Sequence, residues 1–118
     1  KLKADDNITI MVKFDDGSIG NLVYVANGDK SLPKEMIEVF AGGKTGRIHD
    51  FRSGDLHRGN KLVKLKLDGK GHKQEVHSFL NSLKDGNESP IGFESIYLTT
   101  KTTFKIIDSL NTGLPQTL

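Results

Sequence analysis

Four histidines are the residues of this sequence best suited to metal or acid–base chemistry: His49, His57, His72 and His77. His72 and His77 are five positions apart, which places them on different faces of a helix, so they cannot bind one metal ion together. His49 and His57 lie near Asp50 and Asp55 at strand spacings, and surface polar residues have the same spacing. Ser, His and Asp are all present, but no Gly-x-Ser-x-Gly turn presents a nucleophile. A metal enzyme or a hydrolase is therefore not favoured, and no metal ligand or catalytic residue is assigned.

Two glycine-containing segments were compared with nucleotide-binding motifs, and both depart from them. Gly69 and Gly71 precede a predicted helix, but Gln74 stands where a dinucleotide-binding turn requires a third glycine. Gly43-Lys44-Thr45 resembles the end of a phosphate-binding loop, yet Glu38 replaces its first glycine and a strand follows. The sequence alone thus predicts no cofactor site.

Two loop segments combine residues that can bind a polar ligand. Residues 24–35 bring together a tyrosine, an amide, lysines and a glycine just after a strand. Residues 68–72 place a lysine and a histidine before a helix, where the helix N-terminus attracts phosphate or carboxylate groups. The alternatives are a solvated connector for the first segment and a plain strand-to-helix turn for the second.

Alternating apolar residues predict the strands that must position these loops. A hairpin is expected from residues 7–14 and 19–25 around the turn at 15–18, followed by a strand at 35–40 and by short strands at 45–51, 55–58 and 61–67. In the last strand Val63, Leu65 and Leu67 share one face, so Lys64 and Lys66 face water.

The spacing of the apolar residues then changes to that of helices. Val76, Phe79, Leu80 and Leu83 form one stripe of a helix that starts near His72 and ends before Gly86. A second helix is expected over residues 93–110. Strands first and helices last predict an α+β fold, an open antiparallel-rich sheet with the two C-terminal helices packed on one face. The other face is then free for dimerisation or for contact with another domain.

Composition fits one ordinary domain over residues 1–118. Seventeen Lys and Arg against 15 Asp and Glu give a net charge of +2, too small to predict nucleic-acid binding. No apolar run approaches the roughly 20 residues of a membrane-spanning helix, and the absence of Cys excludes disulfides and Cys-based zinc sites. A start at Lys1 rather than Met suggests an excised piece of a longer chain. We expect a cytoplasmic protein that binds neither nucleic acid nor membranes.

Several segments in order resemble the C-terminal domain of the glucose-fructose oxidoreductase, inositol dehydrogenase and rhizopine-catabolism (Gfo/Idh/MocA) family. The segments are Phe14 to Gly20, Tyr24 to Lys30 followed by Pro33-Lys34-Glu35, Ile37 to Phe40, Lys70-Gly71-His72, and Pro90-Ile91 leading to Ser109-Leu110-x-x-Gly113. The match covers nearly the whole chain and is most similar to the two-domain oxidoreductases. No single segment is specific to the family, and the resemblance depends on the order and spacing of all the segments together.

The resemblance implies a larger enzyme whose N-terminal Rossmann domain, absent from this chain, binds NAD or NADP. Such an enzyme moves hydride to or from a hydroxyl of a sugar, cyclitol or nucleotide sugar. This chain would contribute loops on the substrate side and an interface for a homo-oligomer, and it would be inactive alone. The cofactor carries the hydride, and both domains must orient the substrate.

Five residues are the candidates for contacts to that substrate, because they offer hydroxyl, amide and cationic donors: Tyr24, Asn27, Lys30, Lys70 and His72. The Glu-Lys-Pro motif that carries the catalytic lysine of the family is absent here, and its role is not transferred to Lys34. Asp68 and His72 match the spacing of the family's Asp-x-x-x-His pattern, but they follow most of the sheet instead of preceding it. The alternative function is a stand-alone module that binds an anionic or polysaccharide ligand through the lysines of residues 61–66.

Overall fold

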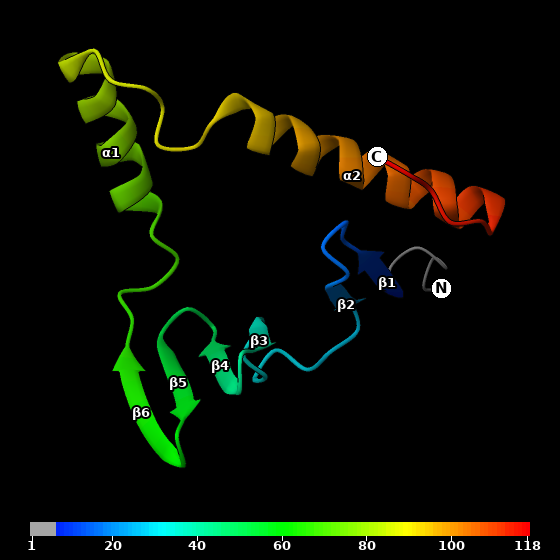
Figure 1. Cartoon of the computed structure of the whole chain (residues 1–118), viewed down its shortest axis with the longest axis horizontal. Coiled ribbons are helices and arrows are strands. Elements are labelled where there is room, and N and C mark those ends of the chain that lie inside the picture. Colours follow the sequence, from blue (N-terminus) through cyan, green and yellow to red (C-terminus); the bar gives the residue numbers. More distant parts are fainter. Residues whose placement is uncertain (1–6) are drawn as a thin grey trace. The chain divides into compact units, whose positions relative to one another are not determined.

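The computed structural model describes residues 7–118, which form six strands followed by two helices (Figure 1). The elements are β1 (Asn7–Lys13), β2 (Ile19–Val25), β3 (Met36–Ala41), β4 (Lys44–His49), β5 (Ser53–Arg58), β6 (Lys61–Lys66), α1 (His72–Asp85) and α2 (Phe93–Thr112). All strand pairs are antiparallel, so the predicted α+β class is confirmed. The strands form two sheets, a pair β1-β2 and a four-stranded sheet in the order β3-β4-β5-β6.

The chain divides into two compact units. One contains the β1-β2 hairpin and the residues from Val76 to the C-terminus, and the other spans Gly28–Glu75 with the four-stranded sheet. The expectations that the helices cover one face of the larger sheet and that residues 1–118 form one domain stay predictions.

The first hairpin is built around a three-residue loop. Gly17 N donates to Phe14 O and Phe14 N donates to Ser18 O, both at 2.9 Å. Gly17 has a φ of 85°, the left-handed conformation that this loop requires and that glycine adopts without steric cost. Asp16 Oδ1 accepts hydrogen bonds from the hydroxyl and the backbone N–H of Ser18, at 2.7 and 2.9 Å. Both bonds hold the pKa of Asp16 below its usual value, and the bond from the Ser18 hydroxyl has the larger effect.

The four-stranded sheet is a meander in which two-residue turns join β3 to β4 and β5 to β6, and residues 50–52 join β4 to β5. The central residues of all three turns have positive φ, as the hairpin turns that match strand twist require. Gly42-Gly43 and Gly59-Asn60 are residue types that adopt this conformation readily, whereas Asp50-Phe51 contains a bulky side chain that does not. The strand expected through residue 51 therefore ends at His49, two residues early.

Both helices begin and end close to the positions that the apolar spacing predicts. Glycines close them as expected: Gly86 and Gly113 are left-handed, with φ of 66° and 69°. Gly113 N also donates to Ser109 O, which satisfies one carbonyl of the last turn of α2. Neither helix is long and apolar enough to cross a membrane.

The described part of the chain contains no buried hydrophobic side chain. Only Gly54 and Ser82 reach the buried class. Large apolar side chains stay exposed on every element, for example Phe40 at 71% and Leu83 at 62%.

Candidate functional site

The four-stranded sheet has two chemically different faces, because the side chains of cross-strand partners lie on the same face and alternate along each strand. One face is apolar. Its residues are Ile37, Val39, Ile48, Leu56, Val63 and Leu65, with Gly46 and Gly54 between them. The register also puts Lys64 and Lys66 on the opposite face from Val63 and Leu65, as predicted.

The opposite face carries a row of alternating charge across all four strands. Glu38, Arg47, Asp55 and Lys64 are successive cross-strand partners. Opposite charges at such positions attract, and Arg47 forms an ion pair with Glu38. This face is suited to water or to a polar partner.

One end of the sheet, which we call the paired end, contains the β4-β5 turn and the segments that flank the sheet in the chain. Here Lys70 Nζ donates to Glu35 Oε1 at 2.6 Å, and Arg52 Nε lies 3.4 Å from Asp50 Oδ2. The second oxygen of Glu35 is buried and has no hydrogen-bond partner among the described residues. The carboxylates at this end thus neutralise the cations beside them.

A histidine and a carboxylate also meet near the paired end. His49 Nε2 and Asp55 Oδ2 are 3.1 Å apart on the charged face. A carboxylate in this position orients an imidazole ring. Neither residue lines the two hollows described below.

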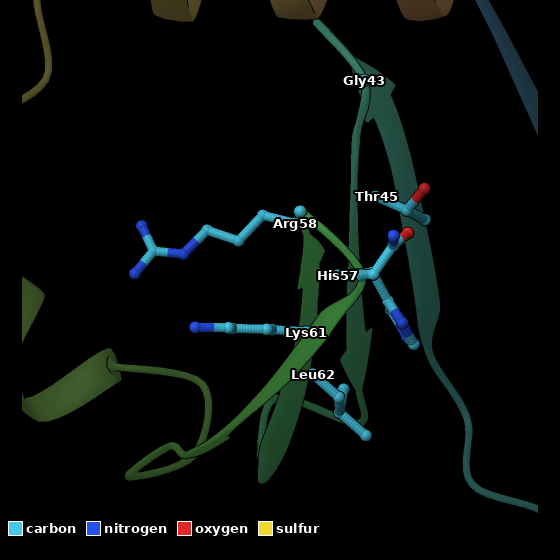
Figure 2. Close-up of a pocket in the computed structure, with 8 residues that line it drawn as sticks. Gly43, Thr45, His57, Arg58, Lys61 and Leu62 are labelled. Atoms are coloured by element: carbon cyan, nitrogen blue, oxygen red, sulfur yellow. The ribbon is translucent and has the colours of Figure 1, made fainter.

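The other end of the sheet, which we call the turn end, contains the Gly42-Gly43 and Gly59-Asn60 turns. A hollow of about 570 Å³ lies there, lined by Gly43, Thr45, His57, Arg58, Gly59, Asn60, Lys61 and Leu62 (Figure 2). Arg58 and Lys61 are cross-strand partners, and their side chains extend side by side to one side of the sheet, whereas Thr45 and His57 extend to the other. Lys44 begins β4 at the same end.

The turn end has no carboxylate. Residues 39–46 and 56–63 include neither Asp nor Glu. Within residues 7–118, Lys44, Arg58 and Lys61 form no ion pair. Three cations therefore remain available to an anionic ligand.

Within the Gly28–Glu75 unit, the structure joins parts of the two loops that the sequence singled out. Lys70 from the second loop pairs with Glu35 at the end of the first. An anion would have to displace this carboxylate to use the Lys70 ammonium. Lys30 and His72 are exposed in the same unit, and Asn27 is exposed in the other unit. Their substrate role stays a prediction.

Tyr24 lies in a different environment from the one expected. With Ile8, Ile10 and Leu22 of the hairpin, it lines an apolar hollow of about 370 Å³ whose other side is formed by the C-terminal half of α2. The residues from α2 are Thr103, Ile106, Ile107 and Leu110. Packing of the hairpin on this helix accounts for Tyr24 without a substrate.

Sequence reasoning missed Arg58 and Lys61 as a pair. The sequence does contain a signal for this pair, because a two-residue turn makes the residues on either side of it cross-strand partners. Gly59-Asn60 is such a turn, and it sets Arg58 against Lys61.

No group of three or more His, Asp or Glu side chains that could hold a metal ion occurs in residues 7–118. Comparisons with protein-family models, with curated proteins and with solved structures found no match to this chain. The resemblance to the Gfo/Idh/MocA family and the activity that it implies therefore stay predictions.

Proposed function

We propose that this chain is the C-terminal, substrate-side part of an NAD(P)-dependent oxidoreductase that acts in the cytoplasm. Its substrate is a hydroxyl-bearing sugar, cyclitol or nucleotide sugar. The order of motifs from Phe14 to Gly113 supports the proposal, and so does the architecture of strands followed by two helices.

The observation that carries the proposal is the apolar face of the four-stranded sheet. Within the Gly28–Glu75 unit taken by itself, the apolar side chains of this face are all half-exposed or exposed. Apolar surface on this scale marks contact with another protein surface. A second domain of the same enzyme and a second copy of the chain supply such surfaces.

In this arrangement the chemistry is divided between the two domains. NAD or NADP, held by the N-terminal domain, accepts or donates the hydride. Residues of this chain bind and orient the substrate: the amide of Asn27 and the cations of Lys30 and Lys70 suit hydroxyl and phosphate groups. Because the cofactor and the other half of the substrate site lie in the N-terminal domain, we expect the chain alone to be inactive.

Two measurements test this function. The first is the mass of the natural protein and the sequence that precedes Lys1 in its reading frame. The second is reduction of NAD or NADP by that protein with a panel of sugars, cyclitols and nucleotide sugars. We expect a Rossmann domain before Lys1 and dehydrogenase activity that the 118-residue chain lacks. A natural protein of 118 residues that unfolds cooperatively as a monomer would contradict the proposal.

The second candidate is a stand-alone module for an anionic or polysaccharide ligand. The observation in its favour is that Lys64 and Lys66 lie together on the charged face of the sheet. Binding through such exposed lysines weakens steeply with salt. Retention on a heparin column that is lost near physiological salt, with no dehydrogenase activity of the natural protein, would favour this module.

A further inference from the structure

We propose that the turn end of the four-stranded sheet is a binding site for a phosphate monoester or for free phosphate, held by Arg58 and Lys61. This site goes beyond the proposed function, because it needs neither NAD(P) nor a Rossmann domain. It is also separate from the five residues that the sequence singled out.

The first argument is charge. A phosphate monoester carries nearly two negative charges at neutral pH. Arg58 and Lys61 are cross-strand partners whose side chains extend side by side (Figure 2), and Lys44 adds a third positive charge at the same end. In the described chain these three cations have no carboxylate partner, in contrast to Arg47, Arg52 and Lys70. A dianion here displaces no existing ion pair.

The second argument is the geometry of the donors. The guanidinium of Arg58 can bind two phosphate oxygens at once, and the ammonium of Lys61 adds a point charge beside it. The Gly59-Asn60 turn joins the two strands between Arg58 and Lys61. It forms without strain, because both of its residues readily adopt the left-handed conformation. The turn therefore fixes the spacing of the two Cα atoms from which these side chains extend.

The third argument concerns the class of ligand. The residues that line the hollow at this end include no Phe, Tyr or Trp, and Thr45 and His57 extend to the opposite side of the sheet from the two cations, so they are not contacts of the ligand. Single-stranded nucleic acid is bound on stacked aromatic side chains, so a phosphorylated small molecule fits this end better than an oligonucleotide.

The test is calorimetric titration of the natural full-length protein, in chloride buffer without NAD(P), with inorganic phosphate and with glucose 1-phosphate. The test variant is Arg58→Gln with Lys61→Gln. The matched control is Lys64→Gln with Lys66→Gln, which removes the same charge from β6 on the other face of the sheet. Each single variant is measured as well, and amide hydrogen exchange of β5 and β6 verifies that the sheet is kept.

We expect binding to one site, weakened about tenfold or more in the Arg58 and Lys61 variant, because hydrogen bonds to charged groups are lost. The control should bind within about twofold of the parent. Tighter binding of glucose 1-phosphate than of phosphate would assign the site to a phosphorylated sugar, and equal binding would assign it to the phosphate group alone.

Three results would overturn the site: no binding by the parent protein, equal weakening in the control, or binding only of an oligonucleotide offered in parallel. Equal weakening would point to the lysine face instead. The outcome is independent of the oxidoreductase proposal, since hydride transfer without phosphate binding, or phosphate binding without hydride transfer, separates the two.

Discussion

The two ends of the four-stranded sheet differ in what neutralises their cations. At the paired end Lys70 and Arg52 each have a carboxylate within 4 Å, from Glu35 and Asp50. At the turn end Arg58 and Lys61 have none. Charge at the paired end ties flanking segments to the sheet, whereas charge at the turn end is open to a ligand.

The turns at the two ends also differ, in how readily their residues adopt positive φ. Both turns at the turn end have residues that accept positive φ, so local sequence is sufficient for them. The Asp50-Phe51 turn has φ of 47° and 56°, which disfavours Phe51, and neighbouring segments hold it. Asp50 N donates to Glu35 O at 2.7 Å, and Gly69 N donates to Phe51 O at 3.0 Å. A strained turn thus coincides with the end where the chain's flanking segments converge.

The largest effect is expected at a glycine in the sheet near the paired end. In Gly54→Ala the new Cβ would lie 3.0 Å from the carbonyl oxygen of Arg47, so this carbonyl must move by a few tenths of an ångström. We expect the free energy of unfolding to fall by about 1–3 kcal/mol, as for overpacked interiors. Hydrogen exchange of the β4 and β5 amides measures it.

Gly46→Ala is the matched control, because its Cβ meets nothing within 4 Å on the same face. We expect no loss there, and a gain of up to about 1 kcal/mol from reduced freedom of the unfolded chain. Equal losses of stability in the two variants would mean that the space around the new Cβ does not determine the effect of the substitution.

The next effect tests the strained turn. Phe51→Gly removes the side chain that disfavours the left-handed conformation and should stabilise the β4-β5 turn by about 1 kcal/mol. The readout is slower exchange of the Arg52 amide, which donates to His49 O at 2.9 Å. Asn60→Gly should change little, because asparagine already tolerates this conformation. Destabilisation by Phe51→Gly would show that contacts of the half-buried ring outweigh the strain.

A smaller effect tests the difference in pairing directly. Lys70→Gln breaks the ion pair with Glu35 and should cost at most about 1 kcal/mol, because both side chains are about 40% exposed. Lys61→Gln should cost nothing, since it relieves repulsion with Arg58. The stabilities of the Lys70 variant and of the parent protein should differ at low salt and converge at high salt, because salt screens the ion pair. Equal sensitivity of both variants would remove the distinction between the two ends.

The smallest effect is a pH dependence in the first hairpin. Because the folded pKa of Asp16 lies below its unfolded value, its contribution is present above about pH 4 and is lost as the pH falls through the folded pKa. Asp16→Ala should therefore loosen the β1-β2 turn at neutral pH and have no effect in acid. Exchange of the Gly17 and Ser18 amides at the two pH values measures this, and an effect that persists in acid would contradict it.

Much of the local structure follows from the sequence itself. Alternation predicted the strands and the spacing of apolar residues predicted both helices, because each pattern states which side chains share a face. The glycines after Asp85 and Thr112 marked the helix ends for the same local reason: only a residue without Cβ adopts positive φ at no cost. The charge row across the sheet and the Arg58–Lys61 pair were not predicted, although both depend only on the register that the turns fix.

What the tertiary structure decided is which distant groups meet. Glu35 and Lys70 are 35 positions apart, and no local rule pairs them; the folded sheet brings their segments together. The same convergence makes a turn of Asp50-Phe51, where sequence favours a strand, because hydrogen bonds from neighbouring segments offset the strain of a positive φ. The sequence by itself therefore determined the elements and their faces, which depend on φ, ψ and period. Tertiary structure alone determined which cations are neutralised and which stay free, because that depends on distances between residues far apart in the chain.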